Sequence, residues 1–91
     1  MDVVHEIGAE ETITYGRNDR FYGGPVGGGR FWLEEDGRPA AKLGGPEEWR
    51  SHGMIDVHTG DTFTVGGQTW KITEIVDADS VDAYLKAVRV S

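Results

Sequence analysis

The three histidines and the acidic residues near them are the side chains of this sequence best suited to chemistry. His52, Asp56 and His58 are separated by even numbers of residues, so a single strand would place them on one face. Two imidazoles and a carboxylate are ligands that zinc or iron accepts. Residues six apart on a straight strand are about 20 Å apart, so His52 and His58 do not meet at one ion. Asp56 and His58 form a site only if His5 joins them from a neighbouring strand. We therefore predict a polar outer face and no metal.

The glycine-rich stretch GGPVGGGR at 23–30 invites comparison with a phosphate-binding loop. Such a loop needs a lysine and a serine or threonine directly after the glycines, at the start of a helix. Arg30 is followed instead by Phe31, Trp32 and Leu33, which are typical of a strand. The dinucleotide-binding fingerprint fails for the same reason. We therefore expect residues 16–29 to form a long, flexible surface loop, and we predict no cofactor.

The sequence offers little for nucleophilic or acid–base catalysis. Cysteine is absent, and no serine lies in a Gly-x-Ser-x-Gly turn. Ser51 and His52 are neighbours, and neighbours on a strand point to opposite faces. The acidic stretch DADSVD at 77–82 lacks the glycine and the terminal glutamate of a calcium-binding loop. These features predict a protein that is not an enzyme.

Charge and length narrow the range of partners and of architectures. The chain has 91 residues, with 16 acidic against 9 basic residues and a net charge of −7. Nucleic acids and anionic membranes attract clustered lysine and arginine, which are scattered here, so we expect neither partner. No signal-peptide pattern and no apolar run near about 18 residues is present, which favours a cytoplasmic protein. The length predicts one domain, residues 1–91.

The stretch from residue 58 to 76 has the clearest structural pattern of the chain. The segments TFTV and QTWKI flank Gly66-Gly67, which suits a two-residue turn with positive φ. That turn places Phe63 opposite Trp70. Side chains alternate along each strand, so one apolar face is predicted to consist of Phe63, Val65, Trp70 and Ile72.

A second hairpin is predicted around Asp36-Gly37, a strong two-residue turn signal between RFWLEE and RPAAKL. It would place Glu35 opposite Arg38 as an ion pair, and Leu33 opposite Ala40. Phe31 and Leu33 would then face the core, and Trp32 would face away from it. Pro39 has no N–H to donate, which predicts that its strand lies at a sheet edge.

Turn signals between short apolar segments predict an all-β fold. Further strands are expected at residues 3–7, 12–15 and 54–57, with one helical turn around Trp49. Apolar residues in DSVDAYLKAVRV at 79–90 follow helical spacing, although VRV is typical of a strand. We expect a small antiparallel barrel or two-sheet sandwich of about six or seven strands, ending in a strand or a short helix.

The hairpin at 58–76 also resembles a family of small uncharacterised bacterial all-β proteins. In these chains a Gly-Asp turn leads to an aromatic residue, a short turn and a tryptophan followed by alternating apolar residues. The matching residues here are Gly60-Asp61-Thr62-Phe63 and Gly66-Gly67-Gln68-Thr69-Trp70-Lys71-Ile72. The resemblance implies that the chain ends in a strand. It brings no catalytic residue and no substrate.

Four aromatic residues have no evident place in the core of the two hairpins: Phe21, Tyr22, Trp32 and Trp49. Exposed aromatic residues are enriched at contact sites, so we predict that these four bind a partner. The function expected is a non-enzymatic binding or accessory protein that contacts another protein or a second copy of itself. Two alternatives remain open. One is a small-molecule-binding barrel or small barrel enzyme, and the other is an acidic inhibitor or immunity-type protein for a basic partner.

Overall fold

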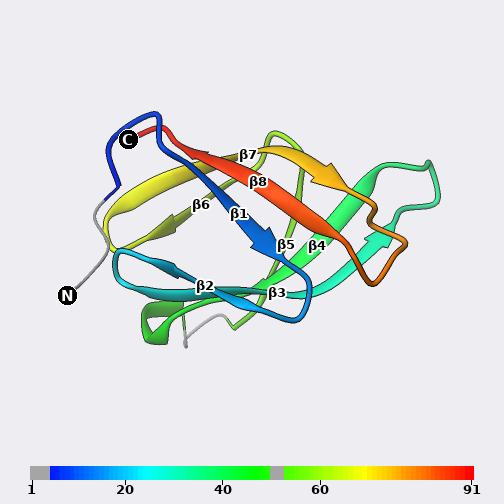
Figure 1. The fold of residues 1–91 in the computed structure, drawn as a ribbon, viewed down its shortest axis with the longest axis horizontal. Coiled ribbons are helices and arrows are strands. Elements are labelled where there is room, and N and C mark those ends of the chain that lie inside the picture. Colours follow the sequence, from blue (N-terminus) through cyan, green and yellow to red (C-terminus); the bar gives the residue numbers. More distant parts are fainter. Residues whose placement is uncertain (1–4, 50–52) are drawn as a thin grey trace.

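A computed structural model of the chain describes residues 5–49 and 53–91 and contains eight β-strands and one short 3₁₀ helix (Figure 1). The all-β prediction is confirmed, with more strands than expected. No helix in this part of the chain is long and apolar enough to cross a membrane. The elements are β1 (Glu10–Thr14), β2 (Asn18–Phe21), β3 (Gly24–Leu33), β4 (Pro39–Gly44), the helix η1 (Glu47–Trp49), β5 (Ile55–His58), β6 (Thr62–Val65), β7 (Gln68–Val76) and β8 (Tyr84–Arg89).

The strands form two antiparallel four-stranded sheets, with strand orders β1-β8-β7-β6 and β2-β3-β4-β5. They make a two-sheet sandwich rather than a closed barrel, and short connections at 15–17 and 59–61 carry the chain between the sheets (Figure 1). Apolar side chains from both sheets fill the space between them. The largest fully buried ones are Trp70, Phe21, Ile13, Leu43, Ile72, Leu85, Val26, Val57 and Val65.

The β6–β7 hairpin has the predicted register. Phe63 lies opposite Trp70 and Val65 opposite Gln68, so the turn has two residues, Gly66-Gly67, both with positive φ. The apolar face of the hairpin is buried in the core, as the alternation of side chains requires. Local turn chemistry and the alternation agree here, which is why the sequence was sufficient.

The predicted register of the β3–β4 hairpin is wrong by one residue. The loop has three residues, because Glu34 N–H donates to the carbonyl oxygen of Arg38 and Gly37 N–H donates to that of Glu34. Gly37 has φ +86°, as expected for a type I turn closed by a left-handed residue. Leu33 therefore pairs with Pro39.

Two further expectations for this hairpin are also wrong. Arg38 forms its ion pair with Asp36 rather than with Glu35. The strand that contains Pro39 is not at an edge, because β4 lies between β3 and β5. Pro39 is the first residue of β4, a position at which a missing N–H is tolerated.

Residues 16–29 are not a flexible loop. They contain β2 and most of β3, paired as a hairpin around Tyr22 and Gly23. The glycines leave room for close neighbours: a Cβ on Gly27 would lie 2.2 Å from Asn18 Oδ1, and one on Gly29 would lie 2.3 Å from Met54 Cε. These glycines are needed because side chains of other segments lie against them. The sequence does not show these contacts, so a glycine-rich strand has the composition of a loop.

The C-terminal residues form strand β8, as the resemblance implied, and the helical alternative is wrong. β8 is hydrogen-bonded to β1 on one side and to β7 on the other. Strand β1 corresponds to the strand predicted at 12–15. The strand predicted at 3–7 lies partly outside the described residues, and its described part, residues 5–7, is not a strand. The helical turn expected around Trp49 is present as η1.

Candidate functional site

The four aromatic residues predicted to bind a partner do not form one surface. Phe21 is 1% exposed and Trp49 is 5% exposed, and both belong to the core. The ring of Phe21 packs edge-on against Trp70, with 4.8 Å between ring centroids. The premise that these two side chains lack a place in the core is therefore wrong. Tyr22 is exposed, but it lies before the start of β3, whereas Trp32 lies near the end of that strand. The two side chains are therefore at opposite ends of β3.

Trp32 lies half-buried on the outer face of the β2-β3-β4-β5 sheet. The guanidinium carbon of Arg30 lies 5.5 Å from the centroid of its indole, within the range of a cation–π contact. Trp32 is opposite Ala40 in β4, and Ala40 is opposite His58 in β5. Ala40 is fully buried although it is not part of the core between the sheets. The larger side chains on either side therefore close over this alanine.

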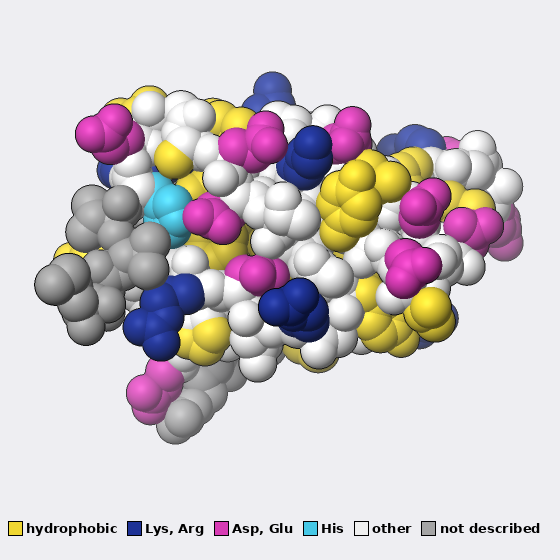
Figure 2. Space-filling model, in the orientation of Figure 1, with side chains coloured by type: hydrophobic (Ala, Val, Ile, Leu, Met, Phe, Trp, Pro, Cys, Tyr) yellow, Lys and Arg dark blue, Asp and Glu magenta, His cyan; other side chains and the backbone are white. Residues whose placement is uncertain are grey.

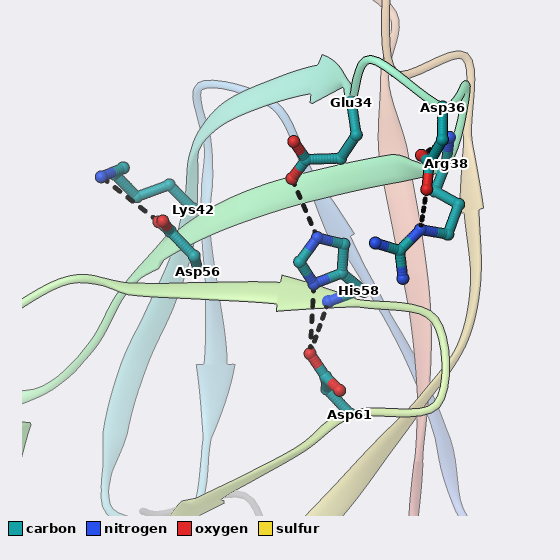
Figure 3. Close-up of polar contacts among 7 residues, drawn as sticks. All are labelled: Glu34, Asp36, Arg38, Lys42, Asp56, His58 and Asp61. Carbon is teal, nitrogen blue, oxygen red and sulfur yellow. Dashed lines mark hydrogen bonds and ion pairs between the residues drawn. The ribbon is translucent and has the colours of Figure 1, made fainter.

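His58 connects two parts of this outer face through carboxylates. Its Nε2 lies 2.9 Å from Oε1 of Glu34, the first residue after β3, and its Nδ1 lies 3.5 Å from Asp61 Oδ2 in the β5–β6 turn (Figure 3). Asp61 Oδ2 also accepts a hydrogen bond from the His58 backbone N–H. The hydrogen bond with Glu34, followed by that with Asp61, raises the pKa of His58 above its ordinary value of 6.5, while burial opposes the shift.

Two further ion pairs lie on the same side of the molecule. Lys42 Nζ lies 3.2 Å from Asp56 Oδ1 across the β4–β5 pair, and Arg38 Nε lies 2.8 Å from Asp36 Oδ2 (Figure 3). The backbone N–H of Arg38 lowers the pKa of Asp36, and the Arg38 guanidinium adds to this effect. Each charged group in these pairs faces a group of opposite charge, as expected for a solvated polar face.

The residues considered above as metal ligands are engaged in separate contacts. Asp56 pairs with Lys42, and His58 lies between Glu34 and Asp61. His5 is buried, with Nε2 2.6 Å from Glu11 Oε1, and its ring packs edge-on against a core tryptophan. His52 lies outside the described residues. Within residues 5–49 and 53–91 no group of three or more histidine, cysteine or acidic side chains is arranged to hold a metal ion.

An exposed apolar surface lies at the end of the sandwich where the β3–β4 and β7–β8 turns meet. We call it the apolar end and define it by Tyr15, Trp32, Leu33 and Val81. These side chains line one surface hollow of about 360 Å³, together with Phe31 and residues 78–80. Tyr15 is 41% exposed, Leu33 49% and Val81 83%. Figure 2 shows hydrophobic and acidic side chains interspersed over this end.

Backbone and ring contacts hold the apolar end together from three distant segments. The N–H of Tyr15 donates to the carbonyl oxygen of Ala83, which ties the end of β1 to the β7–β8 turn. The ring of Tyr15 stacks on that of Phe31, with 6.0 Å between centroids and 19° between planes. Three of its members, Tyr15, Leu33 and Val81, were not identified from the sequence. Leu33 was expected to face the core, but it is the last residue of β3, opposite Pro39, and is 49% exposed there.

Comparison with known proteins gives one match. The model of a family described as "Family of unknown function (DUF6406)" matches residues 8–91. No curated protein and no solved structure matches the chain. The matched region includes all eight strands and the whole apolar end.

Proposed function

Because the chain belongs to the DUF6406 family, whose function is unknown, we propose a function from its surface: a non-enzymatic module that binds another protein through the apolar end. One observation carries this proposal. Three apolar side chains from different segments, Tyr15, Leu33 and Val81, are exposed around a single hollow. Single exposed apolar residues are normal on a protein surface, but contiguous ones around a hollow mark contact sites.

The hollow suits a side chain of a partner better than a small metabolite. Its volume of about 360 Å³ is near the lower end of small-molecule sites. A small-molecule site normally encloses most of its ligand, whereas this hollow lies on the surface beside exposed residues. The alternative of a ligand pocket inside a barrel has no support from the core, because packed side chains fill the space between the two sheets.

A pair of double variants tests the proposal. Leu33→Ser with Val81→Ser alters the apolar end. Ile7→Ser with Val90→Ser removes two other exposed apolar side chains next to the Gly8–Arg89 backbone hydrogen bond. Both doubles are expected to keep the wild-type melting temperature, because exposed side chains contribute little to folding.

The partner is identified by photo-crosslinking in the natural host, with the reactive amino acid at position 33 and, as a control, at position 7. The purified partner is then titrated against each variant by calorimetry. We expect the Leu33/Val81 double to bind at least about tenfold more weakly and the Ile7/Val90 double to bind as the wild type does. Equal affinity of the wild type and the Leu33/Val81 double, or equal crosslinking from position 7, would disprove the proposal.

A further inference from the structure

The two turns beside the apolar end carry a marked excess of negative charge. The β3–β4 loop contains Glu34, Glu35, Asp36 and Arg38, and residues 77–82 contain Asp77, Asp79 and Asp82. The two turns together therefore hold six carboxylates and one arginine. The Arg30 guanidinium is a further cation nearby, and it lies over the ring of Trp32. Figure 2 shows the resulting acidic side chains over this end.

Two of these carboxylates are paired within the described residues, and four are not. Asp36 pairs with Arg38, and Glu34 pairs with His58. In contrast, within the part of the chain that the structure describes, Glu35 and the three aspartates at 77, 79 and 82 make no ion pair. Asp79 lines the same hollow as Leu33 and Val81. A ligand seated in the hollow therefore meets apolar side chains and an uncompensated carboxylate together.

From this combination we infer that the occupant of the apolar end is a protein segment carrying an apolar side chain flanked by lysine or arginine. This inference rests on the proposed function and specifies the chemistry of the partner. Covering Asp79 with an apolar or acidic surface removes water from a carboxylate without replacing its interactions. A basic segment supplies the missing counter-charge while its apolar side chain fills the hollow.

The same charges argue against a second copy of this chain as the occupant. A two-fold contact through the apolar end would bring one set of unpaired aspartates close to the other set, because an isologous interface uses the same patch on both subunits. Like charges brought together at an interface oppose association. The partner is therefore a different protein.

Four short synthetic peptides test the inference directly. Three share a central leucine and differ in their flanking residues, which are lysine, glutamate or serine. The fourth has lysine flanks around a central serine. Each is titrated into the isotope-labelled protein, and the amide resonances of Leu33, Asp79 and Val81 are followed by NMR. We expect the leucine–lysine peptide to bind with the highest affinity and to shift these resonances. Its affinity should fall as salt is added.

Charge variants distinguish this site from general attraction to an acidic protein. Asp77→Asn, Asp79→Asn and Asp82→Asn together remove three negative charges beside the hollow. Glu6→Gln, Glu10→Gln and Glu74→Gln remove three exposed charges that belong to neither turn. We expect the first triple variant to bind the leucine–lysine peptide at least about tenfold more weakly than the wild type. The second triple variant should change the affinity far less.

The results separate this inference from the proposed function. Equal binding of the lysine-, glutamate- and serine-flanked peptides would overturn the basic partner while leaving an apolar contact site. Equal effects of the two charge triples, or no shift of the three resonances by any peptide, would also overturn it. The proposed function fails on a different measurement, namely when the crosslinked partner binds the Leu33/Val81 double as tightly as the wild type.

Discussion

The indole N–H of Trp49 donates a hydrogen bond of 2.8 Å to the backbone carbonyl oxygen of Thr64. Thr64 lies on β6, an edge strand, where every second residue turns its backbone groups away from the neighbouring strand. The neighbouring Glu48 adds a second contact, because its carboxylate accepts a hydrogen bond from the N–H of Gly66. The segment that contains η1 thus covers an edge that would otherwise be open to pairing with another chain.

Trp49→Phe should destabilise the protein through this edge. Phenylalanine keeps most of the packing against Phe63 but removes the donor to Thr64, which leaves a carbonyl without its partner. We expect a loss of about 1–2 kcal/mol in the free energy of unfolding, measured by chemical denaturation. Trp32→Phe is the matched control, because Trp32 lies half-buried on an outer face. Equal stability of the wild type and Trp49→Phe would show that the hydrogen bond contributes nothing.

Trp70→Ala tests the core of the hairpin whose register the sequence predicted. The Trp70 side chain is fully buried and contacts Phe21 and His5 edge-on. Its removal should cost about 3–5 kcal/mol, enough to unfold a large fraction of a small domain. Lys71→Ala changes the next residue, which points to solvent, and should change stability by less than about 0.5 kcal/mol. Similar melting temperatures for the two variants would contradict the observed burial.

Gly66→Ala and Gly67→Ala separate backbone strain from steric overlap. Both glycines have positive φ, so each alanine pays about 1–2 kcal/mol for the left-handed conformation. A Cβ on Gly67 would meet no atom within 4 Å, whereas one on Gly66 would lie 2.1 Å from the carbonyl oxygen of Tyr22. We expect Gly67→Ala to fold with reduced stability and Gly66→Ala to be much less stable. Coincident denaturation curves for the two variants would refute the close approach of the β6–β7 turn to Tyr22 in the β2–β3 turn.

His58 should make stability depend on pH. The carboxylates of Glu34 and Asp61 favour its protonated form, so its pKa in the folded protein lies above that in the unfolded chain. Its contribution is therefore complete below the unfolded value near 6.5 and is lost as the pH rises through the folded value. The effect should stay under about 1 kcal/mol, because the site is close to solvent.

His58→Gln should abolish this part of the pH dependence, measured as unfolding free energy from mildly acidic to mildly alkaline pH. An NMR titration of the imidazole provides a direct check of the raised pKa. Glu34→Gln is the matched control, because it removes the carboxylate that contributes most to the raised pKa of His58 and leaves the imidazole ring in place. An unperturbed His58 titration in the wild-type protein would contradict the geometry of the Glu34 contact.

The sequence alone was sufficient to predict those parts of the fold whose conformation depends on neighbouring residues in the chain. The two glycines at 66 and 67 and the alternation on either side of them fix the pairing of Phe63 with Trp70. The same local rules indicated an all-β chain and the short helical turn at Trp49. Turn chemistry and a period of two depend only on residues a few positions apart, so they can be read from the chain itself.

The candidate site depended on contacts between segments far apart in the chain, and only the tertiary structure decided it. Phe21 is buried because Trp70, about fifty residues later, provides its packing partner, and Trp49 is buried because its ring packs against Phe63 in β6. Leu33 is exposed because it is the last residue of β3, where the cover that Phe31 receives two residues earlier no longer reaches it. Tyr15, Leu33 and Val81 share a hollow because β1, β3 and the β7–β8 turn end at the same place. Sequence periodicity assigns a side chain to a face of its own strand, whereas the packing of the two sheets decides whether that face is covered.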